Sequence, residues 1–294
     1  MERRFHYLIT EDQEGTTIYD YLRSLGYSRG LLLQLKRTEQ GILRNGESVY
    51  GSCRLHAGDS LDIHLVEEKS SEKIPATPMK LNILYEDEDI LVLNKPADMP
   101  IHPSMGNYRN TLANGVAYYF QSQGESFIYR CINRLDRDTT GALILAKHAY
   151  SAALLSSAMQ KRQIHRTYLA LVQGICPEKG LIDAPISRKE GSVIEREVNF
   201  QTGSDARTHF QRLDTRNGLS LVQLCLETGR THQIRVHMKY LGYPLLGDYL
   251  YNPDYSRISR VSLHSYQLDF SHPVTGEALC LQAPVPEDFQ KAWE

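Results

Sequence analysis

The loop Asn133-Arg134-Leu135-Asp136-Arg137-Asp138-Thr139-Thr140-Gly141 runs directly into the apolar segment Ala142–Ala146. A polar loop thus enters an apolar strand, and Gly141 allows the backbone to approach a neighbour closely. Asp136 lies between two arginines in sequence, and such neighbours lower the pKa of a carboxylate and hold it ionised. An ionised carboxylate can act as a nucleophile. The alternative is a capped turn with surface ion pairs, which these residues alone favour.

The chain after position 79 alternates strand and helix patterns without a βαβ rhythm. Several consecutive segments alternate in polarity, as antiparallel strands with one solvent-facing side do. The expected strands are Ile83–Glu86, Ile90–Asn94, Ala142–Ala146, His165–Gln173, Ile194–Gln201, Arg207–Asp214, Ser220–Glu227, Val261–Phe270 and Ala278–Gln282. The expected helices are Thr111–Gln121, Tyr150–Lys161 and His232–Leu241. The sequence therefore predicts an α+β class with a mixed, mostly antiparallel sheet flanked by helices and loops.

Two of the strands carry side chains suited to chemistry. Ile90–Asn94 runs into Lys95, where a cation can meet phosphate, although a plain strand end is the favoured interpretation. In His165–Val172, alternation puts Tyr168 and Leu169 on opposite faces. A tyrosine beside basic residues can stack on a base or move a proton, but more often a tyrosine is simply packed.

A further segment, Glu227–Met238, contains a strand that ends at Thr-Gly and a helix that begins near Thr231. Helix N-termini attract anions, so we expect phosphate near Arg230. His232 and His237 are five residues apart, which is a poor spacing for two metal ligands on one helix, and no acidic or cysteine partner is near in sequence. The sequence therefore predicts no metal site.

Four motifs follow one another: VLNKP (92–96), NRLDRDTTG (133–141), RTYLALVQG (166–174) and TGRTHQIRVHM (228–238), the last followed by GYPLLGD (242–248). Each motif is weak alone, but in this order and at these spacings they resemble the RluA/RluD-type family of RNA pseudouridine synthases. The resemblance covers nearly all of residues 80–294. It implies the catalytic fold of that family and an isomerase that needs no cofactor, because the reaction involves no redox step or external group.

The resemblance also implies roles for particular residues. Asp136 matches the essential aspartate, Tyr168 the tyrosine that stacks on the target base and is the proposed base at C5, and Arg235 the partner of the aspartate. Arg134 matches the arginine that fills the space left by the flipped uridine. Asn133 departs from the usual histidine, which leaves subfamily and RNA choice open. Residues that would shape the pocket and bind phosphate are Arg230, His232 and Gln233.

The first 66 residues indicate a small module. Its expected elements are the helices Thr17–Leu25 and Arg29–Glu39, the second capped by Ser28, and the strands Ile42–Arg44 and Ser60–Val66. This order resembles the RNA-binding module named after ribosomal small-subunit protein S-four, which implies RNA contacts from Arg29, Lys36, Arg37 and Arg44. The alternative is a structural appendage with solvated basic residues. The charged segment Glu67–Pro78 predicts a linker, so we expect a module at 1–66, a linker at 67–79 and a catalytic domain at 80–294.

The 294-residue chain has a formal net charge of −2, with 41% hydrophobic and 23% charged residues, as globular proteins do. One tract, residues 130–166, has seven Lys/Arg against two acids, which suggests a confined anionic contact. The five scattered cysteines argue against a disulfide framework or zinc knuckle. With no apolar leader and no 18-residue apolar run, we expect a cytoplasmic protein without a membrane span, and a monomer by default.

The expected reaction converts specific uridines of structured ribosomal or transfer RNA to pseudouridine after base flipping. Asp136 then adds to the sugar or base, or removes a sugar proton to give a glycal, and the sequence leaves these routes open. One alternative is a glycoside-bond hydrolase that uses Asp136 and Asp138 as a carboxylate pair. Another is a non-enzymatic RNA-binding or ribosome-assembly protein, which the intact set of Asp136, Tyr168 and Arg235 disfavours.

Overall fold

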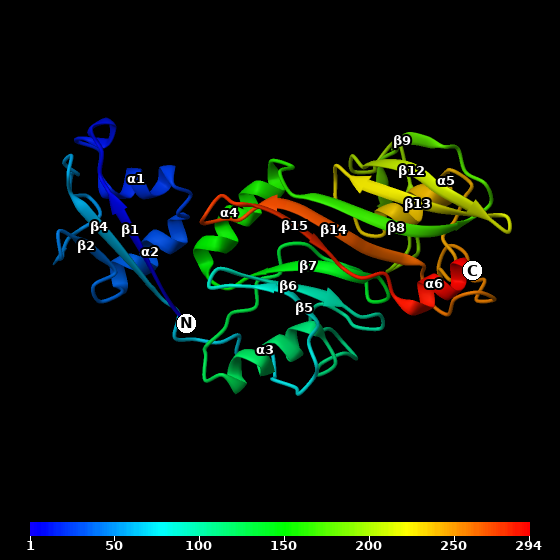
Figure 1. Cartoon of the computed structure of the whole chain (residues 1–294), viewed down its shortest axis with the longest axis horizontal. Helices are drawn as coiled ribbons and strands as arrows, with labels where there is room; N and C mark the ends of the chain where they lie inside the picture. Colours follow the sequence, from blue (N-terminus) through cyan, green and yellow to red (C-terminus); the bar gives the residue numbers. More distant parts are fainter.

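A computed structural model describes all 294 residues and shows a small module at one end of a larger domain (Figure 1). The module has a four-stranded antiparallel sheet in the order β1-β4-β2-β3. Its elements are β1 (Glu2–Leu8), a 3-10 turn (Glu11–Gln13), α1 (Ile18–Ser24), α2 (Arg29–Arg37), β2 (Ile42–Arg44), β3 (Glu47–Ser48) and β4 (Ser60–Val66). Apolar side chains of both helices and the sheet form a core of its own.

The second helix of the module begins at its predicted cap. Ser28 Oγ accepts a hydrogen bond from Leu31 N at 3.3 Å, which satisfies an N–H group that the helix cannot pair internally. The helix ends at Arg37 rather than at the predicted Glu39, because Thr38 adopts an extended conformation. The strand β1 is absent from the predicted elements, yet it pairs with β4 along its whole length.

The larger domain is built on a nine-stranded sheet in which only β7 and β14 pair in parallel. The order is β5-β6-β7-β14-β8-β13-β12-β9, and β15 pairs with β14. The strands are β5 (Ile83–Glu86), β6 (Ile90–Lys95), β7 (Thr140–Ala146), β8 (His165–Gln173), β9 (Lys179–Asp183), β12 (Arg207–Arg216), β13 (Leu219–Leu226), β14 (Leu263–Ser271) and β15 (Ala278–Gln282). The predicted α+β class with a mixed, mostly antiparallel sheet is confirmed.

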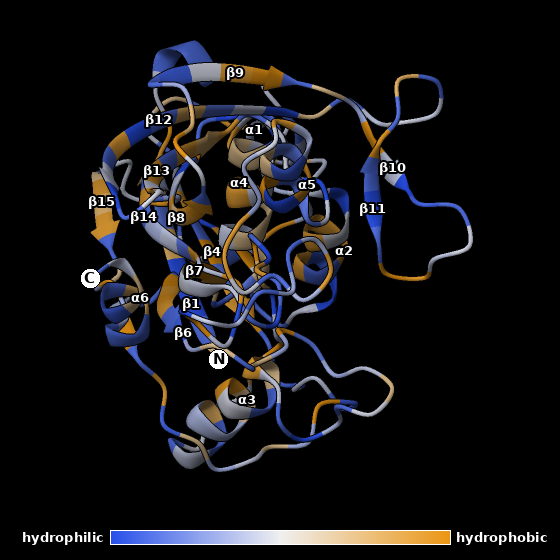
Figure 2. Cartoon of the chain, turned by 90° about the vertical axis from the view of Figure 1, so that its right-hand side faces the viewer, coloured by the Kyte–Doolittle hydropathy of each residue, from blue (hydrophilic) through white to orange (hydrophobic).

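Four helices and a two-stranded ribbon complete the domain. The helices are α3 (Leu112–Ser122), α4 (Ala149–Gln160), α5 (Gln233–Tyr240) and α6 (Glu287–Trp293), and none is long and apolar enough to cross a membrane. The ribbon, β10 (Ile186–Arg188) with β11 (Arg196–Val198), projects from the body in Figure 2. The predicted strand over Ile194–Gln201 is too long, because Asn199 Oδ1 accepts bonds from Gln201 N and Thr202 N and so forms a turn. The sequence also misses β9, β10 and α6.

The central strand β7 is buried along its whole length because both faces of the sheet are covered. Leu143 and Leu145 pack into the core that α3 closes, and Ile144 packs into the core that α4 closes. A strand buried on both sides has a continuous apolar sequence, as Thr140–Ala146 does. The loop that precedes β7 is therefore attached to a strand that is buried on both sides.

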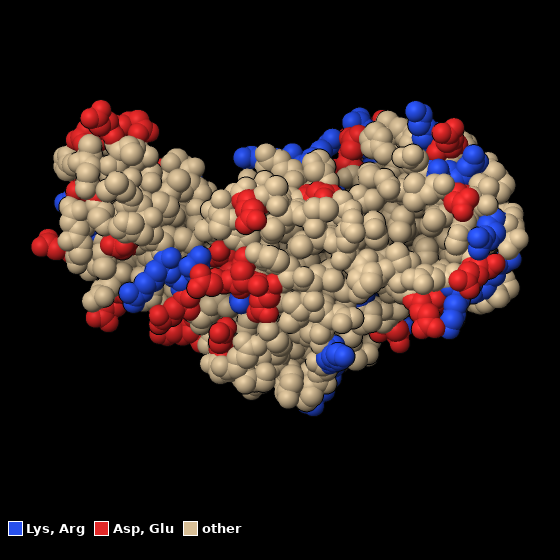
Figure 3. Space-filling model, in the orientation of Figure 1, with Lys and Arg blue, Asp and Glu red and all other residues tan.

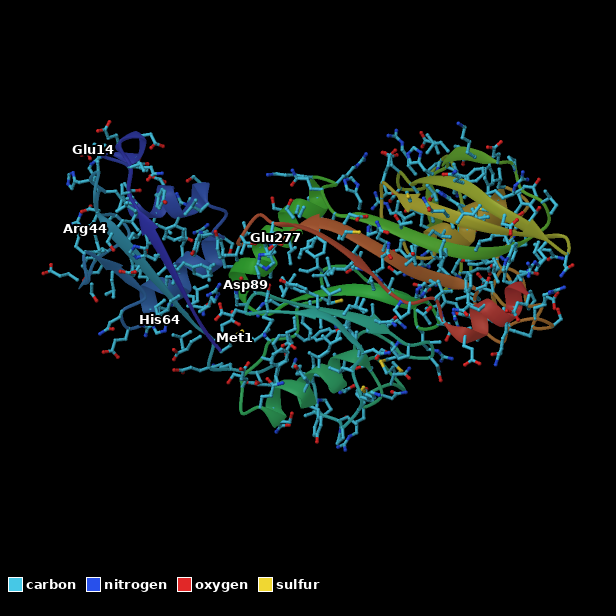
Figure 4. All side chains as sticks on the ribbon, in the orientation of Figure 1. Met1, Glu14, Arg44, His64, Asp89 and Glu277 are labelled. Atoms are coloured by element: carbon cyan, nitrogen blue, oxygen red, sulfur yellow. The ribbon has the colours of Figure 1, made fainter.

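The module docks on α4, at the end of the sheet where β7 finishes. The ring of Tyr27 stacks on Tyr150 of α4 with centroids 4.0 Å apart, and Tyr150 OH donates to Leu25 O at 3.0 Å. Arg3 of β1 binds the buried Asp89 through Nε at 2.9 Å. Figure 4 shows Asp89 at the boundary between the two parts. Apolar stacking and a buried ion pair thus join the module to the domain.

The buried His264 of β14 makes the stability of the fold depend on pH. Its Nδ1 contacts Thr140 Oγ1 at 2.8 Å and its Nε2 contacts Ala283 O at 3.2 Å, while burial lowers its pKa to about 4. In the unfolded chain this histidine binds a proton at about pH 6.5, whereas in the folded chain it does so only at about pH 4. The free energy of unfolding therefore falls as the pH drops from the first value toward the second. In urea unfolding at about pH 7 and about pH 5, we expect the loss to be about 1–2 kcal/mol smaller in His264→Gln than in the wild type. An equal loss in both proteins would contradict this role for His264.

Candidate active site

The loop that precedes β7 is anchored at both of its ends. At its start, the buried Asn133 accepts a bond from Ile144 N at 2.8 Å and donates to Ala142 O at 3.4 Å. At its end, Gly141 has φ +110°, and a Cβ there would overlap the backbone of Ser265 on β14. The close backbone approach predicted at Gly141 is therefore confirmed. Because both ends are fixed, the side chains between them have defined positions.

The cation paired with Asp136 comes from a distant part of the sequence. Arg235 of α5 places Nη1 at 3.4 Å from Asp136 Oδ2. The expectation that Arg134 and Arg137 pair with Asp136 is wrong. Arg137 instead pairs with Asp98 at 3.1 Å, and Arg134 has no carboxylate partner. The pairing of Arg235 with the aspartate that the resemblance implies is present in the structure.

Arg235 is itself held by the fully buried Asp248. Arg235 Nε and Nη2 donate to the two carboxylate oxygens at 2.7 and 2.6 Å, the fork geometry of a strong charge-assisted pair. The N–H groups of Leu250 and Tyr251 also donate to Asp248 Oδ1. Burial by itself would lower the pKa of Arg235, but Asp248 outweighs it and the pKa is raised. A permanent cation therefore faces Asp136 with its remaining Nη1 group.

His232 is the second side chain beside Asp136. It is the N-cap residue of α5 and has a left-handed backbone with φ +57°. The helix therefore begins at Gln233 rather than near Thr231 as predicted. Its Nε2 lies 3.9 Å from Asp136 Oδ2, and its Nδ1 contacts Tyr251 OH at 3.1 Å. Burial lowers the pKa of His232 to about 4 although Asp136 opposes this shift. The imidazole is therefore neutral near pH 7.

Tyr168 of β8 lines a narrow pocket of about 60 Å³ together with Asp136, Arg166 and Arg235. The predicted alternation of the strand is confirmed, since Tyr168 packs into the core on one face and Leu169 into the core on the other. Burial raises the pKa of Tyr168, so its hydroxyl carries its proton at neutral pH. The pocket thus joins a carboxylate, a cation and a neutral phenol.

A wide groove of about 1300 Å³ meets the narrow pocket at Asp136. Asp136, Arg134 and Arg235 line both hollows, whereas Tyr168 lines only the narrow one. A large polymer can lie in the groove while one of its units enters the pocket. The arrangement suits chemistry on a single residue of a long substrate.

Comparisons with known proteins agree with this arrangement. A family model described as RNA pseudouridylate synthase matches residues 89–240. The chain is 42% identical over 276 residues to the uncharacterised RNA pseudouridine synthase YjbO of Bacillus subtilis, covering 94% of this chain and 97% of that protein. It is 35% identical over 253 residues to ribosomal large subunit pseudouridine synthase D of Nitrosomonas europaea, covering 82% and 73%. The chain belongs to the RNA pseudouridylate synthase family.

The structural comparison extends this result. Human RNA pseudouridylate synthase domain containing 1 superposes with a TM-score of 0.58 and 29% identity, covering 70% of this chain and 83% of that one. The protein is an RNA pseudouridine synthase, an isomerase, and the function expected from the four motifs is confirmed. A non-enzymatic RNA-binding role is not favoured.

The other residues implied for substrate binding differ in what they offer. Arg134 and Arg230 of the synthase are exposed and line the narrow pocket. Gln233 is buried, and its Oε1 accepts from Thr228 Oγ1 at 2.8 Å while its Nε2 donates to Thr208 Oγ1 at 3.0 Å. Further bonds to two backbone groups complete the hydrogen bonding of this amide. This geometry argues against a phosphate contact from Gln233, which instead supports the loop before α5.

Lys95 does not meet phosphate, because it is completely buried. Its ammonium donates to the backbone carbonyls of Pro96 at 2.7 Å, Met99 at 3.0 Å and Arg137 at 2.8 Å. Burial lowers the pKa of Lys95 to about 7. The phosphate hypothesis from the sequence is therefore wrong, and Lys95 ties the end of β6 to the loop that carries Asp136.

The basic residues predicted for the module lie far from this pocket. Arg29, Lys36 and Arg37 are exposed, whereas Arg44 is partly used by a bond from its Nη1 to Arg54 O at 2.7 Å. Figure 4 shows Arg44 at the outer side of the module. The module docks at the C-terminal end of β7, whereas Asp136 precedes the N-terminal end of that strand. The seven residues of β7 span about 20 Å, and this length separates the module from the pocket. Figure 3 shows that Lys and Arg near the module junction stand beside many Asp and Glu.

Asp87, Asp89 and His272 bring potential metal-ligand atoms within 4.8 Å of one another near the module junction. His272 Nδ1 accepts a bond from Thr275 N at 3.1 Å, and its Nε2 lies 2.9 Å from Asp87 Oδ2. Asp89 is already bound to Arg3. Both carboxylates therefore have partners within the chain, whereas the buried Nε2 of His272 makes no hydrogen bond.

Sequence reasoning misses Asp248 and Tyr251. The motif GYPLLGD serves there only as a family marker, although its last residue stands 13 positions after Arg235. An acidic residue that closes an otherwise apolar motif needs a buried cationic partner. That single acid was the available signal, whereas nothing in the sequence indicated that Tyr251 contacts His232.

We expect Asp248→Asn to destabilise the synthase by about 3 kcal/mol, because the substitution leaves Arg235 buried with only Asp136 as a charged partner. Urea unfolding measures the loss. The matched control is Asp288→Asn, which removes an equally short fork pair with Arg260. Asp288 is half exposed, so water replaces it and the loss should stay below about 1 kcal/mol. Similar losses in both variants would contradict the expectation that the buried pair of Asp248 stabilises the fold more than the half-exposed pair of Asp288.

Proposed function

We propose that Asp136 is the nucleophile by which this synthase isomerises a uridine that has left its stack and entered the narrow pocket. The observation that carries the proposal is the position of Asp136, where the wide groove and the narrow pocket meet. Base flipping costs a few kcal/mol, and Arg134, unpaired at this junction, can fill the vacated place in the stack. Neutral His232 and cationic Arg235 lie beside the carboxylate of Asp136.

The role proposed for Tyr168 is to move the proton from C5 of the base. The reaction breaks the N1–C1′ bond, turns the base, joins C5 to C1′ and releases the C5 proton. Burial, and to a smaller degree Asp136, raise the pKa of Tyr168, so the phenol enters the reaction protonated. It therefore acts as a relay, accepting the C5 proton on its oxygen while its own proton passes to Asp136, which is free again at this stage.

We also propose that the substrate is ribosomal RNA, as the name of the large-subunit synthase of Nitrosomonas europaea indicates for that relative. In this proposal residues 1–66 are an S-four-like RNA-binding module, 67–79 connect it, and 80–294 catalyse. Arg29, Lys36 and Arg37 would then contact RNA well away from the target uridine. A monomer acting in the cytoplasm is the simplest form of this proposal.

Asp136→Asn tests the nucleophile. An amide can neither attack carbon nor remove a proton, so we expect no measurable release of tritium from RNA labelled at C5 of uridine, while RNA binding survives. The matched control is Asp138→Asn, two residues away, which should keep activity within about tenfold of the wild type. Normal tritium release by Asp136→Asn would reject the assignment, and free uracil as a product would point to a hydrolase.

Tyr168→Phe tests the proton relay separately from stacking. The ring remains in the pocket, so RNA binding should be unchanged, but the single-turnover rate should fall about 100-fold or more, the usual contribution of acid–base catalysis. Tyr240→Phe, on the exposed end of α5, is the control with the same chemical change. An unchanged single-turnover rate in Tyr168→Phe would exclude a proton-transfer role.

A further inference from the structure

The wide groove beside Asp136 is nearly neutral although RNA is a polyanion. Its charged lining consists of four arginines and four aspartates: Arg134, Arg137, Arg235, Arg260, Asp98, Asp136, Asp138 and Asp288. Three of the arginines are bound to carboxylates, as the 2.6 Å pair of Arg260 with Asp288 illustrates. Among these arginines, only Arg134 has no carboxylate partner. Attraction to the backbone of RNA is therefore weak here, and another force must hold the nucleotides next to the target.

Two half-exposed tyrosines in the same groove can supply that force. Tyr249 is 46% exposed and Tyr255 is 50% exposed, and both line the groove with Asp136. Their neighbour Tyr251 is buried, so the exposure is a property of these two positions. Aromatic faces beside nucleic acid stack on bases, and each stacked base contributes about 1–3 kcal/mol. Stacking does not depend on free cations.

The structure holds Tyr249 ready for this contact. It follows the fully buried Asp248, whose carboxylate accepts bonds from Leu250 N at 3.1 Å and Tyr251 N at 3.2 Å, which fixes the turn around Tyr249. The guanidinium carbon of Arg235 lies 5.2 Å from the centroid of the Tyr249 ring. One side of the ring therefore rests on the cation that pairs with Asp136, and its exposed part is left to the groove.

We propose that Tyr249 and Tyr255 form a stacking surface for unpaired nucleotides beside the target uridine, so that the synthase recognises a single-stranded segment such as a loop or bulge. This inference rests on the proposed function and names the form of its substrate. Unpaired bases expose the faces that stacking requires, whereas paired bases bury them within the helix. The tyrosines act by binding and positioning, and they take no part in the proton transfers.

The probe is a single-stranded oligouridine that carries one 2-aminopurine, whose fluorescence is quenched when it stacks on an aromatic ring. With the full chain we expect quenching on binding. Tyr249→Ala and Tyr255→Ala should each weaken affinity by about 5- to 100-fold and reduce the quenching. Tyr249→Phe should bind like the wild type, because it keeps the ring. Tyr240→Ala removes an exposed tyrosine that does not line the groove and should change neither readout.

A second readout separates this inference from the proposed function. In single-turnover assays with ribosomal RNA, Tyr255→Ala should raise the concentration for half-maximal rate more than it lowers the rate at saturation. If the wild type forms pseudouridine but both alanine variants bind and quench as it does, the stacking surface is overturned and the function stands. If the wild type modifies no uridine of ribosomal RNA while the alanine variants still lose oligouridine binding, the proposed substrate fails and the stacking surface stands.

Discussion

Arg235 is a buried cation between two carboxylates, and the rest of the site depends on how it divides its hydrogen bonds. A buried charge is costly unless it is paired. Two of its three nitrogen positions bind Asp248 at 2.6 and 2.7 Å, and only Nη1 reaches Asp136, at the longer distance of 3.4 Å. A full fork pair with Asp136 would occupy the oxygens that attack the substrate in the proposed mechanism. Because Asp248 takes the short bonds, the carboxylate oxygens of Asp136 remain available.

This division requires several chain segments to meet with little freedom. Asp136 stands on a loop pinned to β7 by Asn133 and tied to β6 by Lys95, whose ammonium donates to three backbone carbonyls around it. Arg235 stands on α5, and Asp248 caps the turn that follows that helix. A shift of any one segment would change the 3.4 Å contact. The buried polar groups thus fix geometry where apolar packing alone would allow sliding.

The sequence predicted those features that recur with a regular period or in a motif. The alternation in β8 placed Tyr168 correctly, and the apolar run Ala142–Ala146 correctly predicted a strand after the Asp136 loop. It failed where a partner lies far along the chain. For Lys95 the sequence favoured a plain strand end over a phosphate contact, but it could not reveal the three backbone carbonyls that accept bonds from the ammonium. The sequence neighbours of Asp136 suggested Arg134 and Arg137 as its partners, whereas only the family motif identified Arg235, 99 positions away.

The positions of the module and the pocket also explain how a chain with net charge −2 can act on RNA. The module joins the domain at the end of β7 through Tyr150, about 20 Å from the start of that strand. In the proposed function, its exposed cations Arg29, Lys36 and Arg37 bind the RNA backbone at a distance from Asp136. If Asp136 is the nucleophile, as proposed, a strongly cationic groove beside it would attract its carboxylate and weaken its attack. In the proposed function, the distant cations bind the RNA backbone and the neutral groove leaves the carboxylate of Asp136 reactive. Shape and stacking are then left to select the uridine.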